Sequence, residues 1–131
     1  MKNIATLGVH AESSQNEMSQ YVLLRHLSSF QENDLEALME DYTSDSVLIT
    51  PNTSYTGLEE IKEYFADLIS HFPKQKSIVK IDKTVINDDL VYIVWHAKTP
   101  SLEVSFATDT FIIKKDKILR QTFAGQLTSI G

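Results

Sequence analysis

The stretch FATDTFIIKKDKILRQTFAGQ, residues 106–126, decides the fold class. Runs rich in β-branched and aromatic residues stand on either side of the polar segment 114–117, which is the pattern of a β-hairpin. Two similar runs with turn residues between them precede it, so the second half of the chain is predicted to be a series of antiparallel strands. The four strands are expected over residues 78–86, 90–97, 102–113 and 118–126.

The first half of the chain has the period of helices. Apolar residues recur at steps of three and four in three segments, which is typical of helices with one buried face. Each segment follows a Ser, Asn or Thr that stands three residues before a Glu, the spacing of a helix-capping box. The expected helices are 17–31 after Ser14, 35–42 after Asn33, and 58–72 after Thr56. A short strand, 47–50, is expected between the second and third helices and ends where Pro51 removes a hydrogen-bond donor.

Helices followed by hairpin-linked strands indicate an α+β domain, in which a curved antiparallel sheet packs against the helices on one side. A single domain is expected over residues 15–131, because a chain of 131 residues can bury about two-thirds of its unfolded surface in one core. Residues 1–14 are expected to form a flexible N-terminal arm.

The composition excludes several classes of protein. The chain has no cysteine, which excludes disulfide scaffolds and thiolate metal sites. Its net charge of −6 argues against nucleic acid as a partner, since phosphate binding depends on Lys and Arg. No stretch approaches the ~18 apolar residues of a membrane span. We therefore expect a soluble cytoplasmic protein that binds neither nucleic acid nor membrane.

Neither a metal nor a cofactor is expected. The four glycines form no phosphate-binding loop, and the four histidines lack the i, i+4 pairing of a zinc-binding helix. Covalent acyl transfer is also disfavoured, because the chain has no cysteine and no Gly-x-Ser-x-Gly motif.

The acidic charge is concentrated in the helical half. Residues 1–73 have three bases and twelve acids, a balance of −9, whereas residues 74–131 have nine bases and six acids. We interpret this as Glu on helix surfaces and Lys on strands, where Lys also protects sheet edges. Asp109 does not fit this account, because it stands in the basic half in the middle of a strand.

Two polar residues interrupt apolar elements and are the candidates for chemistry. Asp109 is poorly suited to a strand and would cost several kcal/mol if buried without a partner. His26 lies in the apolar stripe of the first helix, and histidine suits acid–base work near neutral pH. The structural alternatives are a core histidine bonded to a carbonyl, and an aspartate that bonds a backbone amide or pairs with Arg120. Trp95 and His96 face opposite sides of one strand, so at most one of them lines a pocket.

The order of elements and four segments together resemble the nuclear transport factor 2-like superfamily, and most closely its SnoaL-like and ketosteroid isomerase-like branches. The segments are Phe30–Leu38, Tyr42–Val47, Tyr55–Ile61 and Asp109–Ile118. The resemblance covers about residues 17–126. It implies a cone in which a bent antiparallel sheet wraps the helices around a mostly apolar pocket, and a homodimer formed through the outer face of the sheet.

The resemblance also implies roles for three residues near one pocket. In the ketosteroid isomerases, the position matched by His26 is an oxyanion-hole tyrosine, that matched by Thr50 is the general-base aspartate, and that matched by Asp109 is a protonated aspartic acid. A threonine cannot abstract a proton near neutral pH, so steroid isomerisation by the family's scheme is not expected.

We therefore expect a small-molecule pocket. The first hypothesis is an isomerase, cyclase or dehydratase for an apolar carbonyl compound, with His26 as acid or base and Asp109 as its orienting partner or as a neutral donor. The alternatives are a module that binds a hydrophobic ligand without turnover, and a dimerisation module whose sheet face forms the interface. The residues expected to line the pocket are Phe30, Tyr42, Thr50, Tyr55, Phe65, Trp95, His96, Phe111 and Phe123.

Overall fold

The first helix is longer than the sequence predicts. The computed structural model describes the backbone from residue 7 and the side chains from residue 14 to the end of the chain. Helix α1 runs from Leu7 to Gln31, so the capping box predicted at Ser14 lies inside it. Residues 1–6 of the predicted arm lie outside the described residues.

The two other helices begin close to their predicted positions. Helix α2 spans Leu35–Met39 and is capped by Asp34 rather than Asn33, because the Asp34 carboxylate accepts from the amide of Ala37 at 3.1 Å. Helix α3 spans Gly57–Ser70. Thr56 is its N-cap residue, but the Thr56 side chain makes no capping hydrogen bond, and the first turn carries the acidic residues Glu59 and Glu60. All three predicted helices are thus present: α2 begins at the predicted residue and ends earlier, and α1 and α3 begin earlier than predicted.

Asn33 has another role. Its φ of 57° places it in the left-handed region that asparagine tolerates. From there its Nδ2 donates to the carbonyl of Phe72 at 2.9 Å, and its Oδ1 accepts from the amide of Lys74 at 2.8 Å. Asn33 therefore ties the end of α1 to the segment that follows α3.

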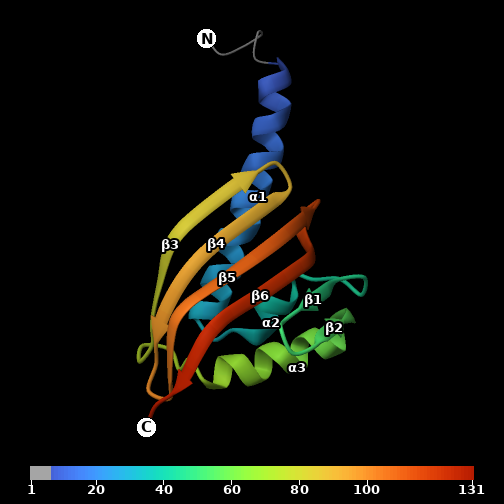
Figure 1. Ribbon diagram of the computed structural model, residues 1–131. Coiled ribbons are helices and arrows are strands. Elements are labelled where there is room, and N and C mark those ends of the chain that lie inside the picture. Colours follow the sequence, from blue (N-terminus) through green and yellow to red (C-terminus); the bar gives the residue numbers. More distant parts are fainter. Residues whose placement is uncertain (1–6) are drawn as a thin grey trace.

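Six strands form one sheet with the order β2-β1-β6-β5-β4-β3 (Figure 1). Their bounds are β1 Val47–Ile49, β2 Ser54–Thr56, β3 Ile78–Asn87, β4 Leu90–Lys98, β5 Leu102–Lys114 and β6 Lys117–Ser129. All neighbours are antiparallel except β1 and β6, which are parallel, so the sheet is mostly antiparallel. Strand β2 was not predicted, because its three residues are too few to show alternation and overlap the capping pattern of α3.

The sheet curves around the helices, which confirms the predicted α+β cone (Figure 1). Alternate residues of β4 are buried on the concave side: Val91, Ile93, Trp95 and Ala97. Strand β3 at the edge is different, since every one of its residues is exposed except the half-buried Ile86. The concave face is therefore well covered over β4, β5 and the first part of β6, and open along β3.

One glycine permits the close approach of two strands. A Cβ placed on Gly125 of β6 would lie 2.8 Å from both the Cβ of Ala107 and the carbonyl oxygen of Phe106 on β5. A glycine is therefore required where these long strands pair on the concave side. Within the described part of the chain, no helix is both long and apolar enough to cross a membrane.

Candidate functional site

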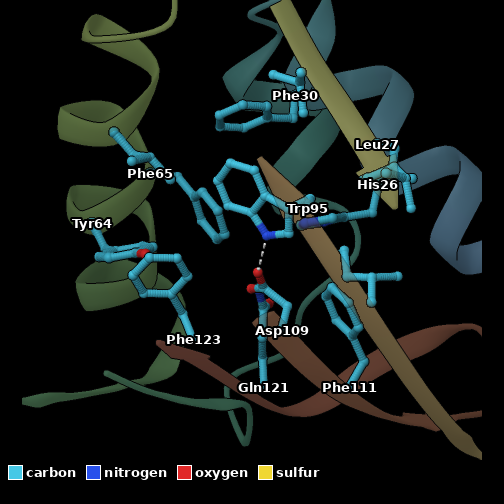
Figure 2. Close-up of a pocket in the computed structure, with 14 residues that line it drawn as sticks. His26, Leu27, Phe30, Tyr64, Phe65, Trp95, Asp109, Phe111, Gln121 and Phe123 are labelled. Carbon is cyan, nitrogen blue, oxygen red and sulfur yellow. Dashed lines mark hydrogen bonds between the residues drawn. The ribbon is translucent and has the colours of Figure 1, made fainter. Parts of the chain in front are cut away.

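A small pocket lies between the concave face of the sheet and helices α1 and α3 (Figure 2). Its volume is about 60 Å³. Most of its walls are aromatic or aliphatic, with Asp109, Gln121 and His26 as polar members. The lining residues are His26, Leu27, Phe30, Tyr64, Phe65, Leu68, Val79, Ile81, Ile93, Trp95, Asp109, Phe111, Gln121 and Phe123.

Asp109 of β5 is buried between its two neighbouring strands. Its Oδ1 accepts from the indole Nε1 of Trp95 on β4 at 2.8 Å, and its Oδ2 accepts from Nε2 of Gln121 on β6 at 2.8 Å (Figure 2). Arg120 is not its partner, because that guanidinium donates to the carbonyls of Asp45 and Leu119 on the exposed surface. The carboxyl group is therefore held by two N–H donors from flanking strands.

These surroundings set the ionisation of Asp109. Burial raises its pKa to about 6, while the hydrogen bonds from Trp95 and Gln121 and the nearby His26 oppose that rise. At pH 7 the carboxylate form therefore predominates, and both of its oxygens act as acceptors. The expected role as a neutral donor is restricted to pH values below about 6.

Gln121 is itself oriented from behind. The hydroxyl of Tyr42 donates to Oε1 of Gln121, which leaves the Gln121 NH₂ group to face Asp109. Burial raises the pKa of Tyr42 well above its usual value, with the carboxylates of Asp41 and Asp109 adding to the effect. Tyr42 therefore stays a hydroxyl donor and lies behind the pocket wall, where it does not line the pocket as predicted.

His26 faces the same pocket from α1. Its ring packs edge-on against Phe111 and Phe65, with centroids 5.4 and 5.8 Å apart. Its Nδ1 lies 3.2 Å from Oδ2 of Asp41. Its Nε2 makes no hydrogen bond within the described residues. Because no fully buried side-chain nitrogen or oxygen of these residues lacks a partner, Nε2 is not fully buried and is open to the pocket that His26 lines. Of the two roles considered for Asp109, that of an orienting partner hydrogen-bonded to His26 is absent, since each residue bonds a different partner.

Asp41 is the residue that sequence reasoning missed. Its side chain is 0% exposed and accepts from Nε of Arg25 at 2.6 Å as well as facing His26. Arg25 also donates to the carbonyl of Asp116 at 2.6 Å, so α1, the end of α2 and the β5–β6 turn meet at this cluster. In the sequence Asp41 is one of the acids of the helical half. The available signal was its place three residues after Leu38, on the apolar face of the helix predicted over residues 35–42.

Residues 23–121 match the model of the SnoaL-like domain, which is most of the chain. The chain belongs to the SnoaL-like family. No curated protein sequence gives a significant match to it.

Solved structures similar to this SnoaL-like chain share its fold at low identity. An NTF2-like protein of unknown function from Mesorhizobium loti is 14% identical with a TM-score of 0.70, covering 86% of this chain and 93% of its own. A proposed polyketide cyclase from Sinorhizobium meliloti is 17% identical with a TM-score of 0.66, and the match covers 78% of this chain and 92% of the cyclase chain. A proposed ketosteroid isomerase from Kribbella flavida is 8% identical with a TM-score of 0.69, and the match covers 84% of this chain and 78% of the isomerase chain. At these identities the likeness establishes the fold alone.

Besides Tyr42, three residues predicted to line the pocket of the SnoaL-like domain lie elsewhere. Thr50 is in the turn between β1 and β2, where its hydroxyl donates to the carbonyl of Thr53 at 3.1 Å and accepts from nearby amides. Tyr55 packs on Tyr64 with ring centroids 4.9 Å apart, one ring removed from the pocket. His96 is on the outer face of the sheet, because Trp95 takes the concave side of β4.

The remaining predicted residues do line the pocket: Phe30, Phe65, Trp95, Phe111 and Phe123. Tyr64 and Gln121 also line it and were not predicted. Among the described residues of this SnoaL-like chain, no three His, Cys, Asp or Glu side chains are grouped so that they could hold a metal ion.

Proposed function

We propose that this chain binds a small apolar carbonyl compound and transfers a proton on it, with Asp109 as the base and His26 facing the carbonyl oxygen. One observation carries the proposal. Asp109 is the single carboxyl group among the residues that line the aromatic pocket, and the pocket also contains the open Nε2 of His26. A base and a group able to bond a developing oxyanion are the two parts that enolisation needs.

The reaction we propose begins with abstraction of a proton from the carbon next to the carbonyl by the Asp109 carboxylate. The electron pair moves onto the carbonyl oxygen, where an imidazolium form of His26 would donate a hydrogen bond from Nε2 while Nδ1 bonds Asp41. Return of the proton to a different carbon completes an isomerisation, and attack of the enolate carbon on a second carbonyl completes a cyclisation. Asp41 acts through His26 and is a positioning residue.

The protonation state of Asp109 predicts how the rate depends on pH. Only the carboxylate can accept a proton, and burial raises its pKa to about 6. The rate should therefore rise as the pH increases through this value.

Proton exchange tests the proposal without knowledge of the natural substrate. Butanone and a β,γ-unsaturated cyclic ketone would be incubated with the protein in D₂O, and loss of the α-proton signals followed by NMR. We expect wild-type protein to accelerate exchange and Asp109→Asn, which keeps the size of the side chain, to lose about 100-fold or more of that rate. Equal rates for the two proteins would overturn the proposal.

A second candidate is binding of an apolar ligand without turnover. The observation that favours it is that the polar side chains in and behind the pocket wall bond one another: Tyr42 to Gln121, and Gln121 and Trp95 to Asp109. A protein of this kind would show saturable binding of apolar ligands with no exchange in D₂O. Its affinity would be the same in His26→Gln.

A homodimer through the outer face of the sheet also remains a proposal. That face exposes apolar side chains, including Val85 at 40% and Phe106 at 52%. Size-exclusion chromatography with light scattering would test it, and Phe106→Glu should shift a dimer to monomer. An unchanged mass would count against the sheet as the interface.

A further inference from the structure

A second hollow opens directly outside the pocket, between the end of α1, the segment after α3 and the edge strand β3. We call it the outer groove. Its volume is about 350 Å³. Four residues line both spaces: Leu27, Phe30, Val79 and Ile81. The groove is completed by Gln31, Glu32, Phe72, Pro73, Lys74, Gln75 and Ser77.

We infer that the ligand is an extended, uncharged apolar compound with one polar reactive end, whose reactive end enters the pocket while its body lies in the outer groove. This inference rests on the proposed function, because it takes the pocket to be where the reacting group binds.

The first argument is size. A cavity of roughly 150 Å³ holds a single benzene ring, whereas the pocket offers about 60 Å³. Only the reacting group and its nearest carbons fit beside Asp109, so the rest of the molecule must extend outward.

The second argument is the surface that the groove leaves open. Val79 and Ile81 lie on the concave side of β3 and are 41% and 38% exposed. Leu27 and Phe30 of α1 also line the groove. Covering such side chains with an apolar molecule is favourable by about 25 cal/mol for each Å² removed from water. The groove walls therefore favour a hydrocarbon body.

The third argument is the charge at the rim. Nζ of Lys74 lies 2.6 Å from Oε1 of Glu32, and both side chains are about half exposed, at 47% and 55%. The two charges neutralise each other across the mouth of the groove. Asn33 holds the backbone of this rim in place through Phe72 and Lys74. A rim without net charge suits an uncharged ligand better than a carboxylate or an amine.

A homologous series of methyl ketones, from butanone to decan-2-one, tests the inference. Binding would be measured by calorimetry on both wild-type and Asp109→Asn protein, so that turnover is not required. We expect affinity to rise by up to about fourfold for each added methylene until the groove is filled. Affinity that does not depend on chain length would overturn the inference, even if butanone undergoes exchange in D₂O.

Two adjacent residues of β3 supply a matched pair of variants. Val79 faces the groove, while Ile78 is 60% exposed and pairs with Lys98 on the opposite face. Val79→Asp should weaken decan-2-one binding about tenfold or more, and by a larger factor than it weakens butanone binding, and Val79→Ser should act in the same direction. Ile78→Asp should change neither. Equal behaviour of Val79→Asp and Ile78→Asp, or a change of oligomeric state caused by Val79→Asp alone, would overturn the inference.

Discussion

Asp109 and His26 line the same pocket, yet no hydrogen bond joins them. Asp109 is bonded to Trp95 and Gln121 on the neighbouring strands, whereas Nδ1 of His26 faces Asp41 outside the sheet. The two groups therefore face the pocket from different elements, His26 from α1 and Asp109 from β5, and each is held by its own partners. This separation suits a reaction in which one group takes a proton from carbon while the other meets the carbonyl oxygen.

The first prediction concerns Asp41. Replacing it by Asn removes the negative charge that faces Arg25 and His26, at a side chain that is fully buried. We expect the free energy of unfolding to fall by about 3 kcal/mol. This value is at the low end of the losses caused by breaking a buried ion pair, because Arg25 is 24% exposed. Urea denaturation measures this.

The matched control for Asp41 is Asp116→Asn. The Asp116 carboxylate is half exposed and 3.9 Å from Nη1 of Arg25, and the short bond from Arg25 goes to its backbone carbonyl, which the variant keeps. We expect a loss of about 0.5 kcal/mol or less. If the two variants lose equal stability, the assignment of Asp41 as the anchor of this cluster is wrong.

The second prediction concerns Gln121. Replacing it by Leu removes a donor that stabilises the carboxylate, so the pKa of Asp109 should move above about 6. The pH profile of ketone exchange should shift to higher pH, with a rate about fivefold lower at pH 6. Carbon-13 NMR of the Asp109 carboxyl reports the same shift without any turnover. Tyr42→Phe should act in the same direction and less strongly, because it only frees the amide of Gln121 to rotate.

The control for Gln121 lies on the same strand. Gln126→Leu makes the same chemical change at an exposed position of β6, whose side chain faces Ser105 rather than the pocket. Its pH profile should coincide with that of wild type. A shift in both variants would mean that the change is not transmitted through the bond to Asp109.

The third prediction concerns Thr50, which the family resemblance matches to a catalytic base. In this chain its hydroxyl instead closes the turn between β1 and β2. Thr50→Ala should leave ketone exchange within about twofold of wild type and lower stability by about 1 kcal/mol through the loss of turn hydrogen bonds. A tenfold loss of rate without unfolding would return Thr50 to the site.

The difference between what the sequence predicts and what it misses has a physical cause. The strands β3 to β6 and the helices are predictable because alternation and three-to-four periodicity are local properties of the chain. Asp109 is also identifiable, because a carboxylate in a strand violates a local preference. The partners of the site are different: Asp41 lies 15 residues from His26 and Gln121 lies 12 from Asp109. Only the curvature of the sheet and the path of α1 bring them together.

The β-bulges in β4 and β5 show the same limit. Alternation places Trp95 and His96 on opposite faces but does not say which is inside. The register shifts after Trp95 on β4 and between Val104 and Phe106 on β5, and such shifts depend on how neighbouring strands coil. Trp95 has a hydrogen-bonding partner on the concave side of the sheet, because its indole N–H donates to Asp109. His96 therefore lies on the outer face, where it pairs with Asp82.

The last prediction is a pH dependence of stability that belongs to Asp109. Its pKa is about 6 in the folded protein against about 4 in an unfolded chain, so the folded state binds the proton more tightly. This contribution to stability is fully present below pH 4 and is lost as the pH rises through about 6. The loss amounts to about 3 kcal/mol at most. Wild type and Asp109→Asn would be unfolded in urea at intervals from pH 4 to pH 8. The difference in unfolding free energy, wild type minus variant, should fall across pH 4 to 6 and then stay constant. A difference that rises with pH, or that does not change, would mean that the pKa of Asp109 is not raised in the folded protein, and its role as a base poised near neutrality would fail with it.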